Sequence, residues 1–208
     1  TGAMTLRLLK KGYDVIGVDL SPEMLGVCRE NCENEGFSPL LLCQDMCSLD
    51  LYGTVEAAVC CLDSVNYLTG DGELDILFSK LKNFISPGGL FIFDINTERK
   101  FGEIYANNVY TYDADGVFCV WQNSFDKKTR LCDFDLTFFI EEKKGLYRRA
   151  EEHQCERCYT VDEISAAAKN NRFTLEAVCS DVGLSPSDGS ELRSYCICRR
   201  NKLQTFPA

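Results

Sequence analysis

The fold is decided by a short apolar run that ends in an acid and leads at once into a helix start, Val15-Ile16-Gly17-Val18-Asp19-Leu20-Ser21-Pro22-Glu23. An apolar run of this length predicts a buried strand. Ser21 is a favourable N-cap, and Pro22 fits the first helical position, where the missing N–H costs nothing. The stretch therefore predicts a strand, a tight turn and a helix that ends near Asn34.

Strand and helix patterns alternate on both sides of this stretch. We expect helices over residues 3–11 and 73–85, and strands over 39–44, 55–62 and 90–95. The run 55–62 is nearly all apolar, which is typical of a strand covered on both faces. Alternation of this kind predicts an α/β fold with a doubly wound, mostly parallel sheet and helices on both of its faces.

The pattern changes after Lys100 to consecutive strands. Residues 117–125, 131–141 and 146–159 are predicted strands, and 110–112 is a candidate edge strand. The alternation is cleanest in 132–140, where apolar side chains occupy every second position. A capping box at Thr160–Glu163 then predicts a helix, followed by strands over 173–180 and 192–199. An antiparallel meander thus interrupts the α/β pattern.

Composition excludes several classes of protein. The 208 residues carry a formal net charge of -10, which disfavours nucleic acid and anionic membrane surfaces as partners. No apolar run approaches the roughly 20 residues that span a bilayer. The thirteen cysteines are an odd number, and many lie in apolar runs, so we expect reduced thiols and a cytoplasmic location.

Four stretches in register together resemble the class I S-adenosylmethionine-dependent methyltransferases. They are residues 1–25, 44–46, 61–67 and 87–94. In that family a glycine-rich loop and the ends of successive strands hold the cofactor. The resemblance implies that Asp19 binds the ribose hydroxyls, that Asp45 faces the adenine amino group, and that Cys61 and Leu62 lie near the sulfonium. The cofactor-binding residues implied in this way are Thr1, Gly2, Asp19, Leu20, Met24, Asp45, Met46, Cys61 and Leu62.

The resemblance also implies a division into domains. Residues 1–102 and 160–208 would form a Rossmann-like cofactor-binding domain, and 103–159 an inserted antiparallel cap sheet. Thr1 and Gly2 match the last residues of the family's glycine-rich loop. We therefore expect the sequence to be truncated at its N-terminus within that loop, with the first strand of the sheet missing.

The meander resembles the cap sheet of small-molecule N-methyltransferases, in which the cap covers the sulfonium and forms the acceptor pocket. Three residues are candidate catalytic groups: His153, Asp63 and Tyr67. His153 is the single histidine, and an imidazole can accept a proton near neutral pH. The alternatives are that His153 is an exposed polar residue and that Asp63 merely caps the turn that follows it.

The function expected from the sequence is transfer of a methyl group from S-adenosylmethionine to a small-molecule acceptor. Such a displacement needs alignment and exclusion of water more than a nucleophile or a metal, and no metal site is expected. No nucleic acid or membrane partner is expected, and a homodimer is a possibility. Two alternatives stay open: a non-catalytic binding module on the same fold, and an oxidoreductase on a related fold.

Overall fold

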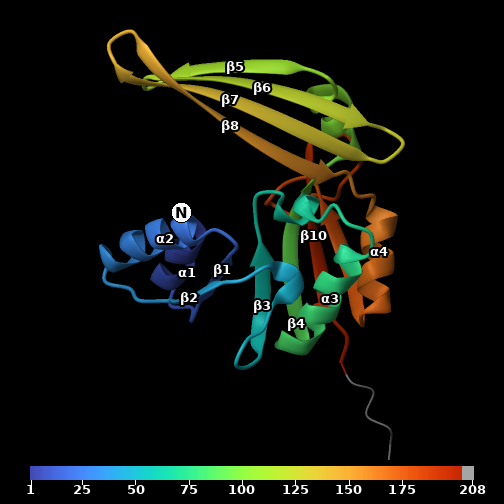
Figure 1. Ribbon diagram of the computed structural model, residues 1–208. Helices are drawn as coiled ribbons and strands as arrows, with labels where there is room; N and C mark the ends of the chain where they lie inside the picture. Colours follow the sequence, from blue (N-terminus) through green and yellow to red (C-terminus); the bar gives the residue numbers. More distant parts are fainter. Residues whose placement is uncertain (203–208) are drawn as a thin grey trace, which may run out of the picture.

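The computed structural model describes residues 1–202 and combines three sheets with flanking helices (Figure 1). Its α-helices are α1 (Ala3–Lys10), α2 (Pro22–Glu33), α3 (Glu73–Phe84) and α4 (Val161–Asn170). Its strands are β1 (Ile16–Asp19), β2 (Leu40–Cys43), β3 (Val55–Cys60), β4 (Ile85–Asn96), β5 (Val109–Ala114), β6 (Val117–Asp126), β7 (Leu131–Lys143), β8 (Leu146–Arg157), β9 (Phe173–Cys179) and β10 (Arg193–Arg200). Single turns of helix follow β2 at η1 (Met46–Ser48), β3 at η2 (Ser64–Tyr67) and β4 at η3 (Lys100–Tyr105).

The main core forms between α3, α4 and a four-stranded sheet in the order β3-β4-β10-β9. β3 and β4 are parallel, whereas β10 is antiparallel to both of its neighbours. α3 and α4 lie together on one face of this sheet (Figure 1). Phe78 of α3 packs edge to face against Phe91 of β4 and Phe173 of β9, with ring centroids 5.6 and 5.5 Å apart. The apolar faces of α3 and of these strands are thereby buried together.

β1 and β2 form a separate parallel pair flanked by α1 and α2 (Figure 1). The α/β class with an antiparallel insertion, predicted from the sequence, is confirmed. One detail of the prediction is wrong: the strand at 55–62 is not covered on both faces. β3 is an edge strand that ends at Cys60, and Val59 is 46% exposed.

The cap sheet is antiparallel in the order β5-β6-β7-β8, so each predicted meander strand is present. It lies over the carboxyl ends of β3 and β4, to which it is joined through η3 (Figure 1). Phe101 and Tyr105 of η3 pack beneath it against Phe134 and the half-buried Trp121. This second apolar cluster fixes one end of the cap to the core. Within residues 1–202, no helix is long and apolar enough to cross a membrane.

Candidate active site

The two acids predicted to bind the cofactor lie at the ends of neighbouring parallel strands. Asp19 is the last residue of β1 and pairs in register with Cys43, which ends β2 two residues before Asp45. Each carboxylate accepts a hydrogen bond that shapes its own turn: Asp19 from the N–H of Ser21 at 2.9 Å, and Asp45 from the N–H of Cys47 at 2.7 Å. Both side chains are exposed, and a carboxylate with two oxygens can hold its turn and still accept from a ligand.

Gly2 is a position where the fold requires glycine. It begins α1 in the left-handed conformation, with φ of 79°. A Cβ atom there would lie 2.4 Å from Sγ of Cys28 on α2, so any larger residue would force the two helices apart. Thr1 is tied to the same helix, because its carbonyl accepts a hydrogen bond from Asn31 Nδ2 at 2.9 Å. These contacts place the N-terminal turn of α1 directly against α2.

The remaining predicted cofactor residues differ in exposure. Leu20 and Met24 are exposed apolar side chains in the turn between β1 and α2 and in the first turn of α2. Met46 follows Asp45 but is partly buried against the main core. Cys61 directly follows β3, and burial together with the charge of Asp94 raises the pKa of its thiol. The exposed pair, Leu20 and Met24, has the apolar surface that a flat adenine ring could contact.

The turn after β3 and the helical turn η2 that follows it hold two of the three predicted catalytic residues. Leu62 and Asp63 both adopt left-handed backbone conformations, with φ of 60° and 52°. The carboxylate of Asp63 accepts from Arg193 Nη2 at 2.9 Å and from Asn96 Nδ2 at 2.6 Å, so it is engaged with protein groups. Tyr67 donates from its hydroxyl to Gln154 Oε1 of the cap sheet at 2.7 Å. The structure therefore brings Asp63 and Tyr67 together near the base of the cap.

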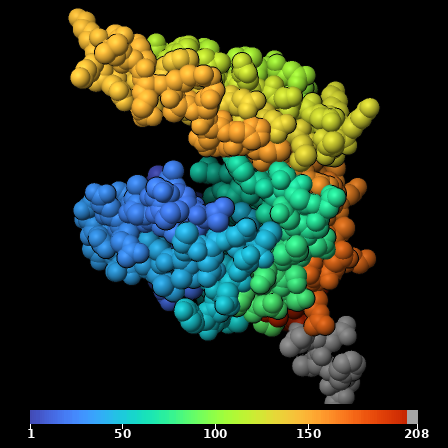
Figure 2. All heavy atoms as spheres, viewed as in Figure 1, coloured from blue at the N-terminus to red at the C-terminus, as the bar shows by residue number. Residues whose placement is uncertain are grey.

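An open cleft separates the free half of the cap sheet from the body formed by α1, α2, β1 and β2, as Figure 2 shows. Residues paired across an antiparallel sheet share a face, so the contact between Gln154 and Tyr67 identifies the inner face of the cap. That face is largely aromatic and apolar, with acids and amides from β8. Its residues include Tyr110, Tyr112, Cys119, Trp121, Asn123, Phe134, Leu136, Phe138, Arg148, Ala150, Glu152 and Gln154.

His153 lies on the other face of the cap. It pairs in register with Asp135, and its Nδ1 lies 2.8 Å from Oδ1 of that residue. The hydrogen bond to Asp135 raises the pKa of the imidazole. Neighbouring residues of a strand point to opposite faces, so His153 points away from the side on which Gln154 meets Tyr67. This placement does not support the catalytic role predicted for His153.

Buried polar residues that the sequence did not single out join the cap to the core. Glu156 of β8 accepts from Asn96 Nδ2 at 2.8 Å, and Lys100 Nζ donates to Asn96 Oδ1, also at 2.8 Å. Burial raises the pKa of Glu156 to about 7, and the nearby carboxylate of Asp63 acts in the same direction. Burial also raises the pKa of Tyr67 to about 12, with Glu156, Asp63 and Glu152 contributing. Tyr67 is therefore a hydrogen-bond donor at neutral pH and not a base.

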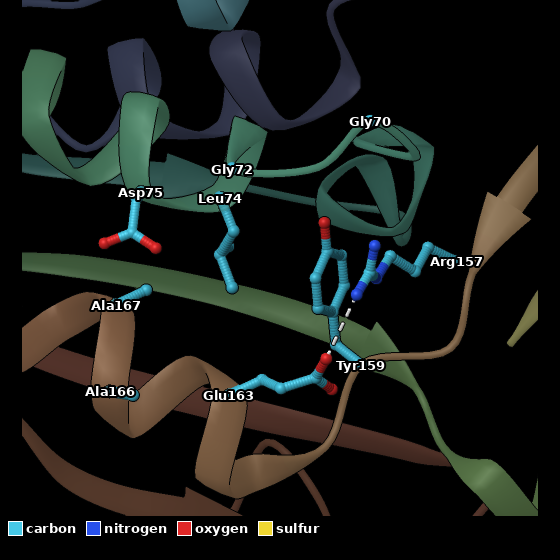
Figure 3. A pocket seen from close by; sticks show the side chains of 9 residues that line it. All are labelled: Gly70, Gly72, Leu74, Asp75, Arg157, Tyr159, Glu163, Ala166 and Ala167. Carbon is cyan, nitrogen blue, oxygen red and sulfur yellow. Dashed lines mark hydrogen bonds and ion pairs between the residues drawn. The ribbon is translucent and has the colours of Figure 1, made fainter. Parts of the chain in front are cut away.

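A separate cavity lies between α3 and α4 and does not involve the predicted cofactor residues (Figure 3). Asp75, Tyr159 and Glu163 line it, together with Arg157, which forms an ion pair with Glu163 at 3.2 Å. Cys158, three residues after Cys155, is buried beside Arg130 at the end of the cap, where its role is packing.

Known proteins are similar to this chain in both sequence and architecture. A profile of the family described as "Methyltransferase domain" matches residues 1–89. A crystal structure of an S-adenosylmethionine-dependent methyltransferase from Clostridium acetobutylicum is 30% identical, with a TM-score of 0.88, over 96% of this chain and 80% of that one. The chain belongs to the S-adenosylmethionine-dependent methyltransferases. This family is defined by its cofactor, so the predicted cofactor and the predicted enzyme class are both confirmed, and the oxidoreductase alternative is excluded.

Two further relatives extend the similarity over most of the methyltransferase chain. A Bacillus subtilis protein described as a methyltransferase, YqeM, is 29% identical over 194 residues, which cover 92% of this chain and 77% of that protein. The sugar N-methyltransferase KedS8 from Streptoalloteichus has a TM-score of 0.75 at 19% identity, covering 97% of this chain and 77% of that one. At that identity the second likeness shows a shared fold, including the cap sheet.

Proposed function

We propose that this methyltransferase transfers the methyl group of S-adenosylmethionine to a small-molecule acceptor held in the cleft beneath the cap sheet. The observation that carries the proposal is the placement of the inner cap face. The cap sheet lies over the carboxyl end of β3 (Figure 1), which the predicted cofactor residues Cys61 and Leu62 follow, and its strand register places the aromatic side chains on the face that meets Tyr67. Ligands of open α/β sheets bind outside the carboxyl ends of the strands.

The chemistry of this cleft fits methyl transfer by alignment. The sulfonium methyl is already activated, so the protein has to hold the acceptor in line with it and keep water out. The half-buried Tyr110, Trp121 and Phe138 of the inner face offer apolar surface. Tyr67, Gln154 and Glu152 offer polar groups at its base. The net charge of -10 favours a neutral or cationic acceptor over an anionic polymer. The sugar N-methyltransferase KedS8, which shares the fold, supports an acceptor of small size.

Turnover of defined acceptors tests the proposal. Full-length protein is incubated with methyl-labelled S-adenosylmethionine and a panel of amino sugars, small amines and hydroxyl compounds, and the labelled product is measured. We expect label transfer to at least one small acceptor and none to nucleic acid. Binding of S-adenosylhomocysteine without transfer to any acceptor would instead support a non-catalytic binding module. An Asp19→Ala variant serves as the control for cofactor-dependent transfer.

A further inference from the structure

We infer that Asp94 and Arg193 are positioning residues that hold the turn after β3 in its left-handed conformation, and thereby shape the cofactor site. The inference rests on the proposed function, because it concerns the same site. It is carried by the contacts of the turn formed by Cys61, Leu62 and Asp63, which joins β3 to η2.

The conformation of this turn needs an external cause. Leu62 and Asp63 are consecutive residues with positive φ, and a bulky L-residue is rarely found there, because its Cβ approaches its own backbone. The side chain of Leu62 is 76% exposed, so packing of that side chain does not hold the backbone in place. Strained residues of this kind persist only where surrounding contacts impose them, and they are frequent at active sites.

Asp94 supplies the contacts that impose the conformation. This residue lies on β4, beside the end of β3, and is 5% exposed. Its two carboxylate oxygens accept from two successive backbone N–H groups: Oδ1 from Leu62 at 2.8 Å and Oδ2 from Asp63 at 2.9 Å. Both N–H groups can meet one carboxylate in this way only while the turn keeps its present shape.

Arg193 completes the arrangement from the neighbouring strand β10. One guanidinium nitrogen, Nη1, donates to Asp94 Oδ2, and the other, Nη2, donates to Asp63 Oδ2 at 2.9 Å. The planar guanidinium thus links the carboxylate of Asp94, which accepts hydrogen bonds from the turn, to the carboxylate of Asp63, which belongs to the turn. It also offsets the repulsion between the two acids, which would otherwise push the turn away from β4. We name Asp94 and Arg193 together the turn clamp.

Amide hydrogen exchange on the unliganded, full-length protein tests the turn clamp directly. We expect the amides of Leu62 and Asp63 to exchange at least about tenfold faster in Arg193→Gln and in Asp94→Asn than in the unmodified protein. The matched control is Arg199→Gln, which removes another arginine of β10 that bonds Glu176 at 2.6 and 2.9 Å, outside the site. Unchanged protection of both amides in both clamp variants would overturn the inference.

Affinity for S-adenosylhomocysteine, measured by calorimetry, tests the functional role. We expect Arg193→Gln to weaken binding about tenfold, and Arg199→Gln to leave it unchanged. In a Leu62→Gly background, the same Arg193→Gln change should weaken the affinity for S-adenosylhomocysteine less than about threefold, because glycine adopts positive φ without strain. An equal loss in both backgrounds would show that Arg193 does not act through the turn. Failure of the unmodified protein to bind S-adenosylhomocysteine at all would overturn the proposed function. Hydrogen exchange would still show whether Asp94 and Arg193 hold the turn in place.

Discussion

At the scale of single residues, Asp19 has the simplest predicted role. Its exposed carboxylate at the end of β1 is expected to accept hydrogen bonds from both ribose hydroxyls of the cofactor. Asp19→Ala should weaken binding of S-adenosylhomocysteine by about 1–3 kcal/mol, because two hydroxyls would lose a charged acceptor. Calorimetric titration measures this. The control variant Asp14→Ala removes a nearby exposed acid before β1 and should bind S-adenosylhomocysteine with unchanged affinity. Equal affinities for the two variants would contradict the ribose-binding role of Asp19.

Glu156 gives a prediction about pH. Burial raises its pKa from 4.5 to about 7, so the folded protein retains a proton that the unfolded chain releases at lower pH. The stabilisation by this proton is complete below about pH 4.5 and is lost as the pH rises through 7. Between pH 5 and 8 the protein should therefore lose roughly 2–3 kcal/mol of stability from this group. Thermal unfolding of Glu156→Gln should lack this loss, whereas Glu151→Gln, on the exposed outer face of the cap, should retain it.

At the scale of elements, the sequence predicted where strands end better than which way their side chains face. Asp19 and Asp45 were predicted through the resemblance to the methyltransferase family, and each lies at or just beyond the end of a strand. An acid at the end of an apolar run is a signal that could also have found Asp94 in the run 90–95. The face of His153 was not predictable, because it depends on the register between β7 and β8, and a shift of one residue reverses every side chain. Arg193 and Asn96 meet Asp63 only through tertiary pairing of β3, β4 and β10.

The junction between η2 and β8 gives a prediction about the cap. The hydroxyl of Tyr67 is a donor that links the two elements through Gln154, and its raised pKa keeps it protonated up to high pH. Tyr67→Phe should lower stability by about 1 kcal/mol and reduce turnover of an acceptor equally between pH 6 and 9. A pH–rate profile measures this, with Tyr147→Phe near the tip of β8 as the control. A change in the shape of the profile would instead show that Tyr67 acts as a base.

At the scale of the whole molecule, the protein contains two separate apolar clusters, one in the main core and one beneath the cap sheet. The main core holds β3 and β4, the strands beneath the cap, and the smaller cluster packs η3 against the cap sheet. At its base, β8 is joined to the core by the hydrogen bonds of Tyr67, Asn66 and Asn96, and by the ion pairs of Arg157 with Asp71 and Glu163. The residues predicted to bind the cofactor and the cap residues proposed to face an acceptor therefore lie on different parts of the chain.

This separation predicts that acceptor choice can be exchanged together with the cap. Replacing residues 97–155 by the corresponding segment of the sugar N-methyltransferase KedS8 exchanges η3, which contains Phe101 and Tyr105, together with the sheet it packs against. It leaves Glu156 in place for Asn96. The chimera should methylate the sugar acceptor of KedS8, while its affinity for S-adenosylhomocysteine stays within about threefold, a difference below 1 kcal/mol. Exchanging only the β7–β8 turn, residues 142–146, should leave acceptor choice unchanged. A chimera that binds the cofactor normally yet keeps its original acceptor would show that the body beneath the cap, and not the cap, selects the acceptor.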